Sequence, residues 1–315
     1  MKINAILLLF IFILGIQKST YAETWNEPWQ KDILKNADFF VLANVISNEE
    51  DVGTTIEILK HFGNQSLSGE VLINGFSLLD IRSSSGHGVH LNFEKGQTLY
   101  FLLTKGEDGN YTLPTPSSGF AGVDEEKNVY ATYRHSYHQA LVPQEVYEKT
   151  YSEIWNYYKT SNYDQVFVMD FIHENLAQPP AGFEPEDLNT FFMQHVALEM
   201  AFLLDISIDL QQLKAFVEYD NFHANISALQ LLGNSKDEDV KEYLFNYIKN
   251  EKNENFQKVI AIWSLRKIGD QKYINKLKTI KNKLSEDQTG FGGNIMDPRV
   301  GTYFPSPKRA VEDLK

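Results

Sequence analysis

The hydrophobic pattern of the chain changes near its middle, from a period of two residues to a period of three or four. Between residues 35 and 142, short apolar or alternating segments are separated by Gly and Asn, a pattern that predicts β-strands joined by tight turns. The predicted strands are residues 39–46, 54–60, 70–73, 98–103, 111–113 and 129–133. Five or six short strands at this spacing predict a small closed barrel or a sandwich.

After Pro143 the apolar spacing becomes helical. An aromatic stripe predicts one amphipathic helix, followed by a second within residues 143–176; the stripe consists of Tyr147, Tyr151, Ile154, Trp155 and Tyr158. Residues 186–285 then predict paired helices, in which 264–269 repeats the pattern of 228–233. Asp270 is the expected N-cap of one helix, and Ser235 with Glu238 forms an expected capping box for another. The predicted fold class is therefore α+β, with two domains.

The strand order of the first half resembles a known family. Residues 37–45, 56–63 and 93–103, with the Gly positions among them, are similar to the netrin-like domain of the tissue inhibitors of metalloproteases. This resemblance implies an OB-type barrel over residues 35–142. The animal inhibitors chelate the protease zinc through an N-terminal Cys, which this chain lacks, so neither that activity nor any functional residue is carried over.

The paired helices of residues 186–285 are similar to short bacterial HEAT repeats, most clearly at the turn Ile268-Gly269-Asp270. Each unit of such a repeat must stack on its neighbours to bury its apolar face. The resemblance therefore implies a short α-solenoid with a concave face.

The first 22 residues have the pattern of a secretory signal peptide. Lys2 precedes an apolar run from Ala5 to Ile16, and Thr20 and Ala22 occupy the −3 and −1 positions of a cleavage site. The run is short for a permanent membrane span, although an uncleaved anchor is the alternative. We expect cleavage after Ala22, no membrane span in the mature chain, and export to the bacterial periplasm or the extracellular space.

The net charge and the absence of cysteine limit the classes of partner and of site that this chain can have. The 315 residues include 42 acidic and 29 basic side chains, for a net charge of −13, and loss of Lys2 and Lys18 with the signal peptide makes it −15. This charge argues against nucleic acid and favours a basic protein partner. The chain has no Cys, which excludes disulfides and thiolate metal sites and fits a bacterial envelope protein.

Two histidine pairs share one spacing: His87 with His90, and His135 with His138. Four imidazoles meeting at the barrel would suit zinc or copper, whereas the alternative is solvated loop histidines. His195 and Glu199 lie one helical turn apart on an apolar stripe. They fit either acid–base chemistry or a buried ion pair inside a helix bundle.

The C-terminal segment, residues 286–315, is rich in Gly and Pro before a short predicted helix. Its apolar residues predict either a strap packed on the helices or a partner-binding loop. These residues are Phe291, Ile295, Met296, Tyr303 and Phe304.

The sequence contains no nucleophile elbow, phosphate loop or His-Glu-x-x-His motif. We therefore expect an exported, non-enzymatic protein-binding module without a cofactor, such as an inhibitor, an immunity protein or an envelope adaptor. The alternatives are a metal-dependent enzyme or metal-binding protein that uses the paired histidines, and a structural scaffold of the envelope.

Overall fold

The computed structural model describes residues 24–49, 52–74, 93–290 and 300–314. The expected signal peptide, residues 1–22, lies outside the described residues. Within these ranges, helices and strands are both abundant, and the mixed α+β class is confirmed. None of the helices in the described ranges has the length and apolar character needed to cross a membrane.

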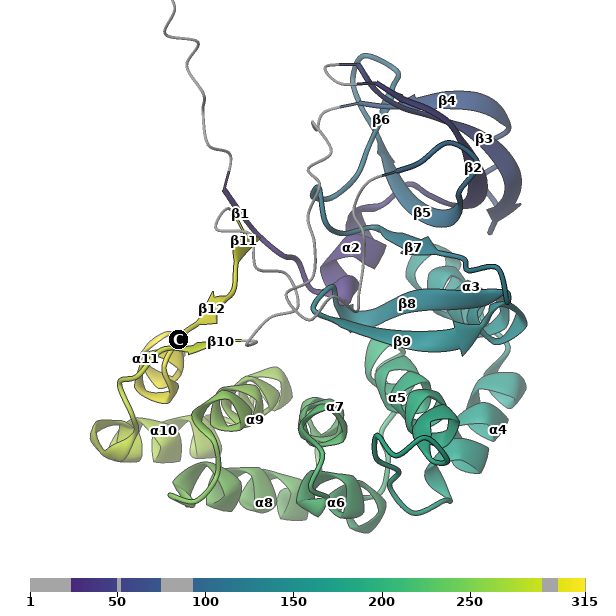
Figure 1. Cartoon of the computed structure of the whole chain (residues 1–315). Helices are drawn as coiled ribbons and strands as arrows, with labels where there is room; N and C mark the ends of the chain where they lie inside the picture. The colour runs from purple at the N-terminus through teal and green to yellow at the C-terminus, as the bar shows by residue number, and fades with distance from the viewer. Residues whose placement is uncertain (1–23, 50–51, 75–92, 291–299, 315) are drawn as a thin grey trace, which may run out of the picture.

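The alternating segments of the first half close into a five-stranded barrel with OB-like topology (Figure 1). The strand order is β2-β3-β4-β6-β5, and β5 pairs back onto β2; the β4–β6 pairing is parallel and the others are antiparallel. Its strands are β2 (Phe39–Glu49), β3 (Gly53–Phe62), β4 (Gly69–Ile73), β5 (Thr98–Lys105) and β6 (Tyr111–Thr112). A short strand, β7 (Phe120–Gly122), extends the sheet beside β5.

Strand β2 shows why the barrel can carry a second layer. Val41, Ala43 and Val45 belong to the apolar cluster that fills the barrel. Phe40, on the opposite face, stacks on Phe62 with ring centroids 4.4 Å apart and belongs instead to the main core that includes helix α3 (Gln144–Thr160). The barrel is thus apolar on the inside and aromatic on the side that meets the helix.

The strand expected at residues 129–133 lies outside the barrel. It forms β8 (Asn128–His135), which pairs with β9 (His138–Pro143) in a separate two-stranded sheet. In Figure 1 this hairpin lies between the barrel and the helices of the second half. The sequence pattern identified the strand but not the sheet to which it belongs.

The helices of the second half follow one another in an arc (Figure 1). Helices α5, α7 and α9 form an inner row, and α6 and α8 pack outside them against α7 and α9. Their bounds are α4 (Gln165–Leu176), α5 (Leu188–Leu203), α6 (Leu210–Glu218), α7 (Phe222–Leu232), α8 (Glu238–Lys249), α9 (Asn255–Ile268) and α10 (Gln271–Ile280), with a 3-10 turn at Lys281–Lys283.

Two helix-capping predictions have different outcomes. The Asp270 side chain accepts the Lys272 backbone N–H, as expected of the N-cap of α10. The capping box of Ser235 and Glu238 is wrong, because Asp237 is the N-cap residue of α8 and the Ser235 hydroxyl accepts the Asp237 backbone N–H. Ser235 therefore stabilises the turn before the helix rather than the helix end.

The two ends of the described chain lie together. Strand β1 (Trp25–Asn26) pairs with β11 (Val300–Gly301), while β10 (Thr289–Gly290) pairs with β12 (Tyr303–Phe304). Helix α2 (Gln30–Asn36) follows β1 and contacts β8, and helix α11 (Pro307–Glu312) packs on α9.

Candidate functional site

The structure places the predicted histidines differently from the sequence-based expectation. His87 and His90 lie outside the described residues. His135 and His138 are not solvated loop residues: their relative exposures are 1% and 7%, at the facing ends of β8 and β9. His135 hydrogen-bonds through Nε2 to the backbone oxygen of Glu27 at 3.1 Å and stacks on Tyr137. Burial lowers the pKa of His135 to about 3, so its imidazole is neutral at pH 7.

His138 belongs to a different group, which we call the histidine cluster: His138, His195 and His223. The His138 ring stacks on His223 with a centroid distance of 4.0 Å and meets the edge of His195 at 4.2 Å. Burial lowers the pKa of all three, to about 3 for His223. Rings this close are compatible with neutral imidazoles, because protonation would place like charges in contact.

A buried ion pair borders the histidine cluster. Arg134 of β8 and Glu199 of α5 lie 3.6 Å apart, with side-chain exposures of 1% and 0%. The Ser227 hydroxyl donates to Glu199 at 2.5 Å and receives a hydrogen bond from Arg134 at 3.2 Å, while Gln230 donates to the other carboxylate oxygen at 3.1 Å. Burial raises the pKa of Glu199 and lowers that of Arg134, and each charge partly offsets the shift of the other.

The predicted pair of His195 and Glu199 therefore belongs to a buried network, and the ionic partner of Glu199 is Arg134 rather than His195. His195 Nδ1 reaches Glu199 only through the Ser227 hydroxyl, at 3.3 Å from that oxygen. Ser227 is fully buried and already hydrogen-bonded to the carboxylate, so it is neither accessible nor activated as a nucleophile. This network fastens the β8–β9 hairpin to α5 and α7.

The metal hypothesis receives no support from the described residues. Within them, no group of three or more His, Asp or Glu side chains is arranged to hold a metal ion. His135 and His138, although adjacent in the hairpin, contact different neighbours: Trp29 and Tyr137 for His135, and the histidine cluster for His138.

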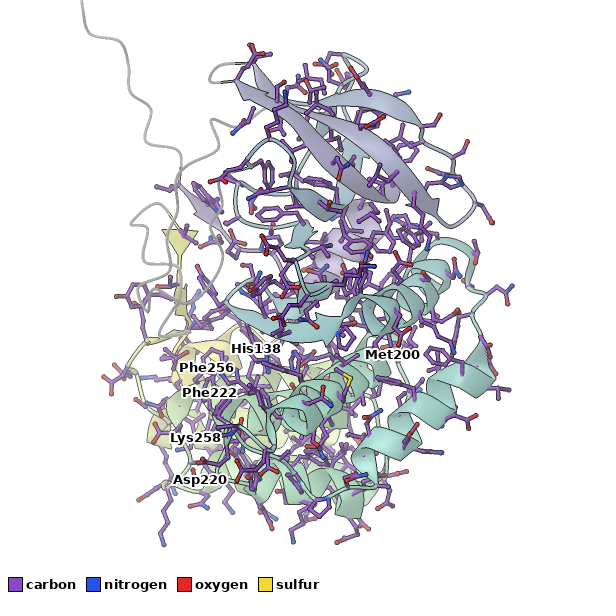
Figure 2. All side chains as sticks on the ribbon, turned by 45° about the vertical axis from the view of Figure 1, so that its right-hand side comes forward. His138, Met200, Asp220, Phe222, Phe256 and Lys258 are labelled. Atoms are coloured by element: carbon purple, nitrogen blue, oxygen red, sulfur yellow. The ribbon has the colours of Figure 1, made fainter. Side chains whose placement is uncertain are left out.

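His223 connects the buried network to the surface. Its ring contacts Phe183 at 5.8 Å and Phe222 at 5.4 Å, and Phe222 contacts Phe256 at 5.6 Å. Phe256 in turn contacts Phe304 at 5.6 Å. We call these five rings the aromatic strip; Figure 2 shows Phe222, Phe256 and His138 along the same side of the helices.

Two members of the aromatic strip are unusually exposed. Phe183 and Phe222 have relative exposures of 57% and 39%, and they flank the same imidazole. Adjacent exposed aromatic side chains are typical of interaction sites rather than of ordinary surface. The exposed part of the strip thus consists of Phe183 and Phe222.

Acidic side chains are frequent in the loops that carry or precede these rings. They precede the three inner helices, in the loops that lead into α5, α7 and α9, and we call them the acidic rim: Glu184, Glu186, Asp187, Asp220, Glu251 and Glu254. All six are exposed. Acidic residues near helix N-termini also interact favourably with the helix dipoles, which accounts for their position without requiring a ligand.

The predicted partner-binding residues of the C-terminal segment have separate positions. Tyr303 is 76% exposed. Phe304 packs against Trp29 and Trp263, with centroid distances of 6.1 and 5.8 Å. Phe291, Ile295 and Met296 lie outside the described residues.

The tryptophans beside Phe304 border a cavity of about 240 Å³. Its walls are mainly Trp29, Trp263 and Phe202, with Lys31 and Lys267 at the edge. Both lysines pair with the single carboxylate of Asp205, at 3.4 and 2.7 Å, and the acidic side chain of Asp32 also lines the cavity. This cavity suits an apolar group.

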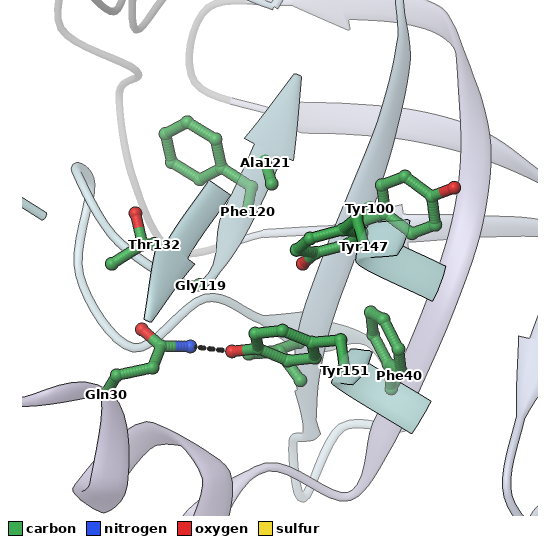
Figure 3. Close-up of a pocket in the computed structure, with 10 residues that line it drawn as sticks. Gln30, Phe40, Tyr100, Gly119, Phe120, Ala121, Thr132, Tyr147 and Tyr151 are labelled. Carbon is green, nitrogen blue, oxygen red and sulfur yellow. Dashed lines mark hydrogen bonds between the residues drawn. The ribbon is translucent and has the colours of Figure 1, made fainter. Parts of the chain in front are cut away.

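A second cavity, between the barrel and α3, is too small to bind a ligand. It measures about 10 Å³, room for about one water molecule, and is lined by Phe40, Tyr100, Tyr147 and Tyr151 (Figure 3). Gln30 donates a hydrogen bond to the Tyr151 hydroxyl across it. It is an imperfection in the aromatic packing between the two halves.

Sequence reasoning missed Arg134, His223, Phe183 and Phe222. One signal was available: Asn-Phe occurs at 221–222 and again at 255–256, at the start of two inner helices. A repeated aromatic residue at the exposed end of successive helices would have indicated a shared surface.

Comparisons with known proteins give no relative: no family model, no curated protein and no solved structure matches the chain.

Proposed function

We propose that this chain is an exported, non-enzymatic protein-binding module that engages a basic protein partner through the aromatic strip and the acidic rim. The observation that carries the proposal is the pair of exposed rings, Phe183 and Phe222, on either side of His223. Aromatic side chains are frequent anchors of protein interfaces, because they bury a large area with little loss of conformational entropy.

Charge gives the proposed partner its chemistry. The acidic rim lies in the loops that carry or precede the aromatic rings, and the whole chain has a net charge of −13. A basic partner would be steered to this surface and would gain rim contacts around an apolar centre. A role as an inhibitor, immunity protein or adaptor fits such a surface.

The architecture and location proposed for this module are those expected from the sequence. Helices α5–α10 would form a short HEAT-like α-solenoid, and the mature chain would begin at Glu23 in the periplasm or the extracellular space. The order of the inner helices supports the first point: His195 and Glu199 of α5 meet Ser227 and Gln230 of α7 in the same chain direction, as stacked repeats require.

The inner side of these helices is partly occupied by the chain itself. Trp29 from the N-terminal segment contacts Trp263 of α9 at 6.0 Å, and the β8–β9 hairpin contacts α5. The proposed docking surface is therefore the edge at the N-terminal ends of α5, α7 and α9 rather than the middle of the concave face.

Site-specific photocrosslinking tests this proposal. Benzoylphenylalanine at position 183 or 222 should crosslink one basic protein in the native envelope fraction. The yield should fall in about 0.5 M NaCl, where the Debye length is about 4 Å. The matched control is position 166, because Val166 of α4 is also an exposed apolar residue, at 72%.

An adduct of the same yield from position 166, an acidic adduct, or no adduct from positions 183 and 222 would contradict the proposal. The basic protein identified in an adduct from position 183 or 222 would then be purified. Its affinity would be measured for the unmodified chain and for the chain carrying Phe183→Ala and Phe222→Ala. We expect a loss of at least about tenfold, or about 1.4 kcal/mol.

A further inference from the structure

A polar cavity of about 460 Å³ lies among helices α6 to α9, and Glu254 of the acidic rim is one of its lining residues. It is formed by the end of α6, the first half of α7, the second half of α8 and the start of α9. Its volume is within the roughly 300–1,000 Å³ range of small-molecule sites. We call it the amide pocket, because five carboxamides line it: Asn225, Asn246, Asn250, Asn253 and Gln257.

One of these carboxamides has an unused hydrogen-bonding atom in the protein interior. Asn225 is only 5% exposed, and its Oδ1 is buried without a hydrogen-bond partner in the described part of the chain. Its Nδ2 is occupied, since it donates to the Val217 carbonyl at 2.5 Å and to the Tyr247 hydroxyl at 3.4 Å. A buried acceptor left unpaired destabilises the fold, so a donor from the pocket, a water or a ligand hydroxyl, would stabilise this carboxamide.

The neighbouring polar groups are fixed in position by bonds that leave part of their capacity free. Tyr247 donates its hydroxyl to Gln257 Oε1 at 2.9 Å, a bond that does not use the Gln257 amide nitrogen. Asn253 donates through Nδ2 to the Tyr247 carbonyl at 2.8 Å, a bond that does not use its Oδ1. The pocket thus presents both donors and acceptors, held by their own hydrogen bonds.

Two aromatic rings complete the lining. Tyr243 and Tyr247 lie one turn apart on α8, with ring centroids 6.4 Å apart and planes inclined at 42°. Both rings are partly exposed at the pocket. Aromatic faces with a negative quadrupole attract the weakly positive C–H groups of an aliphatic ring.

We propose that the amide pocket binds a neutral saccharide. Each sugar hydroxyl both donates and accepts a hydrogen bond, which matches carboxamides that offer both functions side by side, and a hydroxyl is the donor that Asn225 Oδ1 lacks. The tyrosine rings would cover the C–H face of one sugar unit. The charged lining residues are of both signs, and Glu218 already pairs with Lys214, so an ionic ligand finds no net attraction.

The test uses saturation-transfer NMR on the purified full chain with cellobiose, maltose and diacetylchitobiose, each at about 20 mM, a concentration suited to millimolar affinity. Acetyl-trialanine amide serves as a peptide probe of similar polarity. We expect at least one disaccharide to bind and the peptide not to bind. Binding of none of the three sugars, or binding of the peptide in their place, overturns the proposal.

Variants locate the site. Asn246→Ala removes an exposed amide of the pocket and should weaken binding at least tenfold, as should Tyr243→Ala; far-UV circular dichroism checks that each variant is folded. Asn275→Ala on α10, also an exposed helical Asn, is the matched control and should bind as the unmodified chain does. Binding unaffected by Asn246→Ala overturns the assignment. Phe183→Ala should leave sugar binding unchanged, which separates this proposal from that of the aromatic strip.

Discussion

Arg134 and Glu199 form an ion pair that is almost completely removed from solvent. Such a pair needs further hydrogen bonds, because desolvation of two charges costs more than their attraction alone recovers. Both Glu199 oxygens accept such bonds, whereas Arg134 Nε is buried without a partner among the described residues. Ser227 and Gln230 provide two donors to the carboxylate, while the Ser227 hydroxyl and the His223 carbonyl accept from Arg134. The pair therefore depends on both α5 and α7 being in place.

This dependence leads to a prediction for a double-mutant cycle. Arg134→Met should lower the free energy of unfolding by about 3–5 kcal/mol, because it leaves a buried carboxylate without its cation. Glu199→Gln in the same chain should restore part of this loss, with a coupling energy of about 1–3 kcal/mol, measured by urea unfolding.

The exposed pair of Lys308 and Glu286 is the matched control for this cycle. Its coupling should be much smaller, because solvent and salt screen it. Additive effects of Arg134→Met and Glu199→Gln would contradict the role assigned to the buried pair.

Among the structural elements, the turn after β3 comes very close to α3. Gly63 directly follows β3 and has φ +77°, and a Cβ at this position would lie 2.6 Å from Trp155 Nε1 and 2.9 Å from Cδ1. Trp155 is 2% exposed, so it has little space to move away. Only Gly allows both the left-handed turn and the close approach.

We therefore expect Gly63→Ala to destabilise the protein by about 2–4 kcal/mol, combining the left-handed backbone cost with overpacking. Gly69→Ala is the matched control, since Gly69 has the same φ of +77° but nothing within 4 Å of its Cβ position. It should cost only about 1–2 kcal/mol. Equal losses in thermal or urea unfolding would show that the indole does not restrict this turn.

Elements were largely predictable from the sequence, and the site was not. The alternation in β2 and β3, and the aromatic stripe of α3, are local patterns that short-range periodicity reveals. The contacts of His138 with His195 and His223 join residues far apart in the chain, so no spacing rule predicts them. The His-x-x-His spacing was misleading because His135 and His138 face each other across the turn of a hairpin and contact different neighbours.

At the scale of the whole molecule, the β8–β9 hairpin joins the barrel side to the helices and to the N-terminal segment. Arg134 and His138 bind it to α5 and α7, while Glu27 accepts a hydrogen bond from Ser136 at 2.6 Å and so ties the N-terminal segment to its turn. Unfolding of this junction therefore exposes several buried groups together, and it should be cooperative with loss of the helical packing.

Four of those groups are histidines whose pKa burial lowers: His135, His138, His195 and His223. The positive charge of Arg134 lowers all four pKa values further, and Glu199 is already engaged by Arg134. In the unfolded chain each imidazole titrates near about 6.5. Below that pH the unfolded state binds protons that the folded state does not, so stability falls as the pH decreases.

The free energy of unfolding should therefore fall with decreasing pH, with a slope that approaches about 1.4 kcal/mol per pH unit for each of the four histidines between about pH 6 and pH 5. Urea unfolding measured from about pH 7.5 to pH 5 should show this fall in the unfolding free energy. His223→Asn retains an acceptor for Arg134 and should reduce the slope by about one histidine's share. His173→Asn, at an exposed position of α4, controls for the substitution itself. A slope that His223→Asn does not alter would mean that His223 is protonated in the folded protein, and the histidine cluster would then require an anion that these contacts do not provide.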